Sequence, residues 1–95
     1  MPTFHVELSF HAACRDGRVT LGRRLELPFP PYPGLKVCWG DDPDGYPLTS
    51  VTFATDRRLF LCPLVPLRSP ETIAQLTAAY AARGWEFTVT WREPR

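Results

Sequence analysis

The stretch that decides the fold is FHVELSFHA, residues 4–12, in which apolar and polar side chains alternate without a break. Successive side chains of a β-strand point to opposite faces, so this pattern predicts a strand with one buried face. The apolar side chains of that face are Phe4, Val6, Leu8 and Phe10. The polar face carries His5, Glu7 and His11.

A second strand follows Asp16-Gly17, a pair suited to the positive φ angles of a tight hairpin turn. The two-residue period resumes after this pair, with apolar side chains at Val19, Leu21, Leu25 and Leu27. We therefore expect the first two strands to form an antiparallel hairpin.

Prolines shape the middle of the chain. Residues 28–34 hold four prolines, which fix φ and remove backbone donors, so we expect a stiff, extended connection there. Three further strands are expected over residues 35–39, 48–54 and 58–64. The turns between them are expected at Asp42-Pro43-Asp44-Gly45 and at Thr55-Asp56-Arg57.

One helix is expected near the end of the chain. Ser69 is the expected N-cap, with Pro70 at the first helical position and Glu71 where the helix dipole favours an acid. The apolar stripe is Ile73, Leu76 and Tyr80, and Gly84 supplies a left-handed stop after which Trp85 folds back on the last turn. Residues 85–92 alternate again and are expected to form a half-buried strand.

The expected fold is therefore a single α+β domain over residues 1–95, with the order βββββαβ. We expect the first five strands to run as a meander in a twisted, mostly antiparallel sheet of five to six strands, with the helix packed on one face. The sequence leaves the last strand either paired in parallel with the first strand or alone at an edge. The aromatic side chains expected in the core are Trp39, Trp85, Trp91, Phe60 and Phe87.

Composition places the 95-residue chain among ordinary globular domains. Its 11 Lys and Arg against 10 Asp and Glu give a net charge of +1, which excludes a domain-wide basic field. The start of the chain lacks the pattern of a secretory signal, and no apolar run approaches the roughly 20 residues that span a bilayer. The preference for Arg over the single Lys36 indicates a GC-rich bacterial coding sequence. We expect a cytoplasmic protein with no membrane partner.

Cysteines and metal-ligating residues are sparse. Cys14, Cys38 and Cys62 show no C-x-x-C spacing, and we expect buried free thiols. His5 and His11 would stand roughly 20 Å apart along a strand, too far to share an ion. Asp41, Asp42, Asp44 and Gly45 resemble the start of a calcium loop, but the later Glu is missing. We expect no metal and no cofactor.

The polar residues raise two alternative hypotheses of function, nucleic-acid binding and catalysis. In the expected meander, one end of the sheet gathers arginines and exposed aromatic rings, which can hold a single nucleic-acid strand. These candidate nucleic-acid-binding residues are Phe29, Tyr32, Arg57, Arg58 and Arg83. The second alternative is a small hydrolase or metal-dependent enzyme that uses His5 or His11 as a base.

The leading expectation is a small non-enzymatic binding or protein-interaction module. The sequence holds no glycine-rich phosphate loop and no nucleophile motif, while its turns, caps and alternation agree with one another. The expected partner is another protein or a second copy of the chain, because an unpaired last strand offers an edge for strand addition. No catalytic residue is expected.

Overall fold

The computed structural model describes residues 2–38 and 45–94, which form two compact units. The first unit contains the chain up to Ser9 together with Arg24–Val65. The second contains Phe10–Arg23 together with the chain from Pro66 onward. Strands β1 (Phe4–Cys14) and β2 (Gly17–Leu27) each contribute one part to each unit.

The predicted hairpin is confirmed in β1 and β2. The two strands are neighbours in the sheet, and the two turn residues at 15–16 are too few to join parallel strands. The turn falls one residue earlier than predicted, because Gly17 already belongs to β2. The alternation of β1 is also confirmed, since Val6, Leu8, Phe10 and Ala12 are buried while His5 and His11 are exposed.

In the first unit the strand order is β5 (Thr52–Ala54), β6 (Leu59–Pro63), β1 and β2. β6 pairs with β1 in parallel, with Val6 opposite Phe60, and β5 pairs with β6 antiparallel. β3 (Lys36–Val37) and β4 (Tyr46–Pro47) form a separate two-stranded antiparallel sheet. The buried apolar side chains of this unit are Val6, Leu8, Leu48, Leu59, Cys62 and Leu64.

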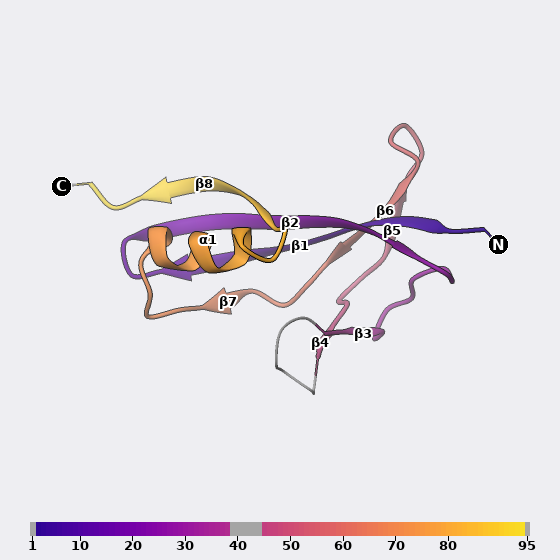
Figure 1. The fold of residues 1–95 in the computed structure, drawn as a ribbon, viewed down its shortest axis with the longest axis horizontal. Coiled ribbons are helices and arrows are strands. Elements are labelled where there is room, and N and C mark those ends of the chain that lie inside the picture. Colours follow the sequence, from indigo (N-terminus) through magenta and orange to yellow (C-terminus); the bar gives the residue numbers. More distant parts are fainter. Residues whose placement is uncertain (1, 39–44, 95) are drawn as a thin grey trace. The chain divides into compact units, whose positions relative to one another are not determined.

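In the second unit, β7 (Leu67–Arg68) pairs with β1 in parallel, and β8 (Glu86–Arg92) pairs with β2 antiparallel. Figure 1 shows helix α1 (Ile73–Ala81) lying along the hairpin strands, with β8 beside β2. The Phe10 ring centroid lies 5.4 Å from that of Tyr80 and 5.3 Å from that of Trp85. The buried apolar side chains of this unit are Phe10, Ala12, Val19, Leu21, Ile73, Leu76 and Trp85.

The two ends of α1 differ in how well they were predicted. The N-cap is Thr72 and not Ser69: the Thr72 hydroxyl accepts the Gln75 N–H, and the Gln75 side chain accepts the Thr72 N–H. Ser69 instead accepts the Glu71 N–H at 3.1 Å and closes a turn before the helix. The predicted stop is confirmed, because Gly84 has φ 90° and the Trp85 N–H donates to the Tyr80 carbonyl at 3.1 Å.

The α+β class is confirmed as one helix with a mixed sheet, which has six strands in the part of the chain that is described. The meander order βββββαβ is wrong, because β6 joins β1 in parallel and the segment between β2 and β5 forms only the small β3–β4 sheet. A parallel pair needs a long connection, which residues 15–58, including β2, supply between β1 and β6. β8 takes the edge position beside β2. The predicted Asp42-Pro43-Asp44-Gly45 turn falls largely outside the described residues.

The predicted aromatic core is only partly correct. Trp85 is 3% exposed, but Phe87 is 46% and Trp91 is 53% exposed, because both lie on the edge strand β8. Phe60 is half-buried, and Trp39 lies outside the described residues. In the described segments, no helix has the length and apolar character needed to cross a membrane.

Candidate functional site

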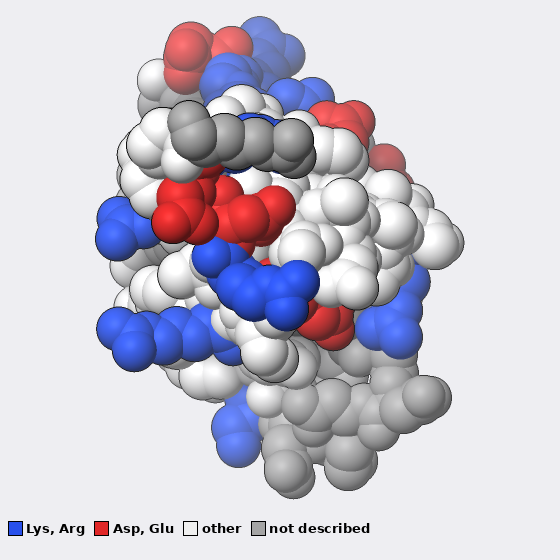
Figure 2. All heavy atoms as spheres, turned by 90° about the vertical axis from the view of Figure 1, so that its left-hand side faces the viewer, with Lys and Arg blue, Asp and Glu red and all other residues white. Residues whose placement is uncertain are grey.

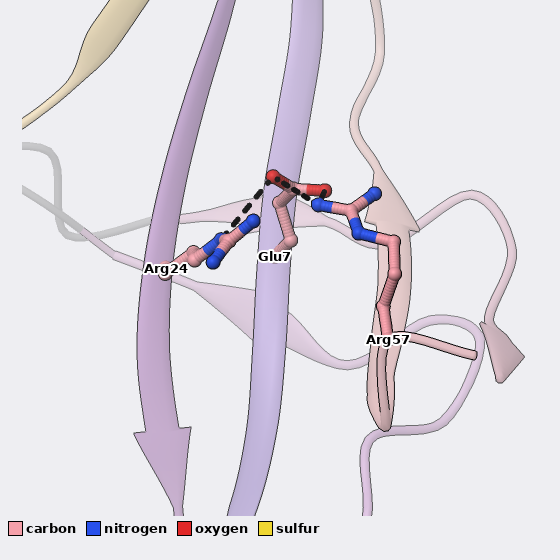
Figure 3. A network of polar contacts seen from close by, with 3 residues as sticks. All are labelled: Glu7, Arg24 and Arg57. Atoms are coloured by element: carbon pink, nitrogen blue, oxygen red, sulfur yellow. Dashed lines mark hydrogen bonds and ion pairs between the residues drawn. The ribbon is translucent and has the colours of Figure 1, made fainter. Parts of the chain in front are cut away.

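The first unit carries a charged cluster on the polar face of the sheet. Glu7 of β1 lies between Arg24 of β2 and Arg57 of the turn before β6, as Figure 3 shows. The Arg57 Nη2 atom lies 3.2 Å from Glu7 Oε2, and the Arg24 Nε atom lies 3.6 Å from Glu7 Oε1. One carboxylate therefore contacts two guanidinium groups and offsets one of their two positive charges, which leaves less positive charge here than the sequence suggested.

A shallow recess of about 490 Å³ opens beside this cluster. His5 stands at its rim with Nδ1 3.6 Å from Glu26 Oε1, an exposed pair that contributes little to stability. Arg58 also lines the recess and has φ 54°, a left-handed conformation that turns the chain into β6. The residues that line the recess are His5, Arg24, Leu25, Glu26, Arg57, Arg58 and Leu59. The lining holds three arginines against Glu26, and Glu7 pairs with two of these arginines beside the recess, so part of the positive charge is offset.

The predicted nucleic-acid-binding residues fall in both units. Phe29 and Tyr32 are exposed, at 42% and 53%, and belong to the first unit with Arg57 and Arg58. Arg83 is exposed and belongs to the second unit. Arg57 and Arg58 share the recess just described, while Phe29 and Tyr32 are not among its lining residues. Their joint use by a nucleic-acid strand stays a prediction.

The two histidines have different surroundings. His11 Nδ1 lies 2.9 Å from the Thr20 hydroxyl oxygen across the hairpin. This places a base beside a hydroxyl group, but no carboxylate within ion-pair distance orients the imidazole among the residues that are described. Within the same residues, no group of three or more His, Cys, Asp or Glu side chains is placed to hold a metal ion.

The second unit has a recess that sequence reasoning missed, on the face of β1 and β2 that carries the exposed side chains. It has a volume of about 460 Å³ and is lined by basic, apolar and hydroxyl side chains. The lining residues are His11, Ala12, Ala13, Arg18, Pro66, Leu67, Arg68 and Thr90. The alternation of β2 places Arg18 on the same face as Thr20, but nothing in the sequence indicated that Arg68 of β7 would join them.

Charged groups of both signs lie on the face of the chain that Figure 2 shows. Among the described residues, the turn acid Asp16 forms no ion pair with Arg18; its Oδ1 atom accepts the Ile73 N–H at 2.8 Å at the start of α1. Carboxylates are absent from the residues that line the recess.

The three cysteines are free but not uniformly buried, contrary to prediction. Cys62 is buried in β6, Cys14 is half-buried at the end of β1, and Cys38, which directly follows β3 of the small two-stranded sheet, is exposed. Burial raises the pKa of the Cys62 thiol to about 11 from its ordinary value of 9.0. Burial, together with Asp16 and Glu71, also raises the pKa of Cys14.

These differences predict the order of alkylation by iodoacetamide. At pH 9, a thiol with a pKa of about 11 is only about 1% thiolate, so buried Cys62 reacts last and exposed Cys38 reacts first. Peptide mass spectrometry over a time course measures the order, and a urea-unfolded sample, in which all thiols react alike, is the control. Early labelling of Cys62 in the folded protein would contradict the burial described here.

The raised pKa of Cys62 also affects stability at alkaline pH. The folded protein holds this proton to about pH 11, whereas the thiol of the unfolded chain loses it around 9.0. The unfolded state therefore binds fewer protons in that window, and the free energy of unfolding falls as the pH rises from 9 to 11.

No protein family, curated protein or solved structure matches the chain.

Proposed function

We propose that the protein is a small, non-catalytic interaction module that pairs with a second copy of its own chain through the free edge of β8. The observation that carries this proposal is the position of β8 at the end of the strand order, with nearly every one of its side chains exposed. Phe87 and Trp91 are among them, at 46% and 53% exposure.

An edge strand presents unpaired N–H and C=O groups, and proteins usually protect such edges with proline, lysine or very short strands. β8 has neither proline nor lysine over Glu86–Arg92, the irregularity in its pairing with β2 falls between Val89 and Trp91, and the regular segment FTV has high β-propensity. The opposite edge strand, β5, is only 3 residues long. Strand addition is therefore favoured at β8.

The regular part of β8 sets the register of the pairing. Phe87, Thr88 and Val89 pair in sequence with β2, and the register shifts beyond Val89. An antiparallel pair with its two-fold axis at Thr88 places Phe87 of each copy opposite Val89 of the other, a favourable aromatic and β-branched contact. No like charges face each other across this axis.

The Thr88→Lys variant tests the pairing. Two lysines would face each other at the axis, so the dissociation constant of the dimer should rise at least about tenfold, which corresponds to about 1.4 kcal/mol. Size-exclusion chromatography with light scattering measures the mass of the wild type and of the variant over about 1 µM to about 1 mM.

Thr52→Lys in β5 is the matched control, because Thr52 is an exposed threonine on the opposite edge strand. This variant should keep the wild-type mass profile. A wild-type mass of one chain throughout the concentration range would contradict self-association. Equal effects of the two lysine substitutions would place the contact elsewhere.

A further inference from the structure

Across the exposed sheet face of the second unit, a row of side chains runs over four neighbouring strands and holds two arginines and a tryptophan. Arg68 of β7 lies opposite Ala13 of β1, and Arg18 of β2 lies opposite Trp91 of β8. The two-residue turn at 15–16 places Ala13 opposite Arg18, in the register that the contact between His11 and Thr20 also requires.

The spacing of this row suits a phosphate group. Neighbouring strands lie about 5 Å apart, so the backbones of Arg18 and Arg68 are about 10 Å apart with only the Ala13 methyl group between them. The two arginines therefore lie on either side of a position that carries only a small side chain. Arg18 and Arg68 both line the recess of about 460 Å³ above it.

A second recess adjoins the first on the β8 side. It has a volume of about 430 Å³ and is lined by Arg18, Thr90 and Trp91. Arg18 and Thr90 line both recesses, so the two form one continuous surface with Trp91 at its far end. The half-exposed Trp91 indole offers a surface for stacking of a planar ring.

The charge of this surface is uncompensated. Arg24 and Arg57 of the first unit are held by Glu7, but Arg18 and Arg68 have no carboxylate within 4.0 Å in the part of the chain that the structure describes. The neighbouring residues on this face, two positions along each strand from Ala13 and Arg18, are His11, Thr20 and Thr88, and none of them is acidic. His11 is hydrogen-bonded to Thr20, and Thr20 lies opposite Thr88. Continuing along β8 from Trp91 past Thr88, the first acidic residue is Glu86, which lies opposite Gly22.

We propose that this face binds a nucleotide unit, with the phosphate between Arg18 and Arg68 and the base stacked on Trp91. Paired guanidinium groups bind phosphate oxygens, and an exposed indole stacks on any base regardless of sequence. Hydroxyl groups of Thr20 and Thr88 extend the face with hydrogen-bonding partners for sugar oxygens. The site does not depend on pairing through β8, because it lies on the face of the sheet and not along its edge.

The test is a fluorescence anisotropy titration of a short, fluorescein-labelled oligothymidylate with the full chain at about 50 mM and about 200 mM salt. We expect binding at low salt that weakens at high salt. Arg18→Ala combined with Arg68→Ala should weaken binding at least about tenfold and flatten the salt dependence. Trp91→Ala should weaken it about fivefold or more, and Trp91→Phe should retain most of the affinity.

The matched control is Arg57→Ala combined with Arg58→Ala, which removes the same charge from the first unit and should change the affinity less than about twofold. Absence of binding at low salt, or equal losses in the two double variants, would overturn the site. The exposed positions of Arg18, Arg68 and Trp91 predict unchanged circular dichroism in every variant.

Competition identifies the source of the nucleotide. Displacement of the oligonucleotide by about 1 mM thymidine monophosphate would support a free nucleotide as ligand, and failure of displacement would support a single strand. Equal displacement by inorganic phosphate would overturn the role of the base and leave an anion site only.

Discussion

Replacing Trp85 with alanine should lower the free energy of unfolding by about 3–5 kcal/mol, as expected for a buried tryptophan. Trp85 is 3% exposed, and its ring centroid lies 5.3 Å from that of Phe10 and 5.8 Å from that of Tyr80. It therefore joins β1 to the last turn of α1, and its removal leaves a cavity that side chains on two elements cannot fill. Urea denaturation followed by circular dichroism measures the change.

Trp91→Ala provides the control, because it removes the same side chain from a position that is 53% exposed. Its effect should stay within about 0.5 kcal/mol. Comparable losses of stability in the two variants would show that the assignment of Trp85 to the core and of Trp91 to the surface is wrong.

Gly17→Ala should lower the free energy of unfolding by about 3 kcal/mol or more, because a β-carbon has no space at this position. It would overlap the Trp91 carbonyl oxygen and lie 2.7 Å from Ile73 Cδ1 and 3.0 Å from Arg92 Cα. Two of these three atoms belong to the backbone of β8, so relief requires β8 to move away from β2. Thermal unfolding followed by circular dichroism measures the loss.

The comparison variant is Gly84→Ala. Gly84 has φ 90°, but a β-carbon there meets only Arg23 Nε at 4.0 Å, so its loss reflects the left-handed conformation alone, about 1–2 kcal/mol. A loss at Gly17 no larger than that at Gly84 would contradict the close approach of β8 to Gly17.

The local features of this fold could be predicted from the sequence because they depend on neighbouring residues. Alternation in residues 4–12 predicted the buried face of β1, and Gly84 with Trp85 predicted the end of α1. The start of the helix was harder, because Ser69-Pro70 and Thr72 with Gln75 are both N-terminal signals. The reciprocal hydrogen bonds of Thr72 and Gln75 distinguish them only in the folded chain.

The pairing of distant segments could not be predicted in the same way. A parallel pair such as β1 and β6 leaves no turn signal between its strands, so a local meander was the simpler interpretation of the same alternation. The row that contains Arg68, Arg18 and Trp91 depends on the registers of β1 with β7 and of β2 with β8. Likewise, strict alternation predicts that the Trp91 side chain points into the core. Trp91 is exposed instead, because it lies on an edge strand and beyond the shift in register between β2 and β8.

The central position of the β1–β2 hairpin has a consequence for synthesis on the ribosome. β1 and β2 emerge first, but their sheet neighbours β6, β7 and β8 all lie in the later part of the chain. Until those segments emerge, the nascent hairpin exposes two unpaired edges and its apolar face. Such non-local pairing slows folding, and the exposed intermediate is prone to association with other chains. The newly made chain is therefore expected to need the protection of chaperones most before β8 has left the ribosome.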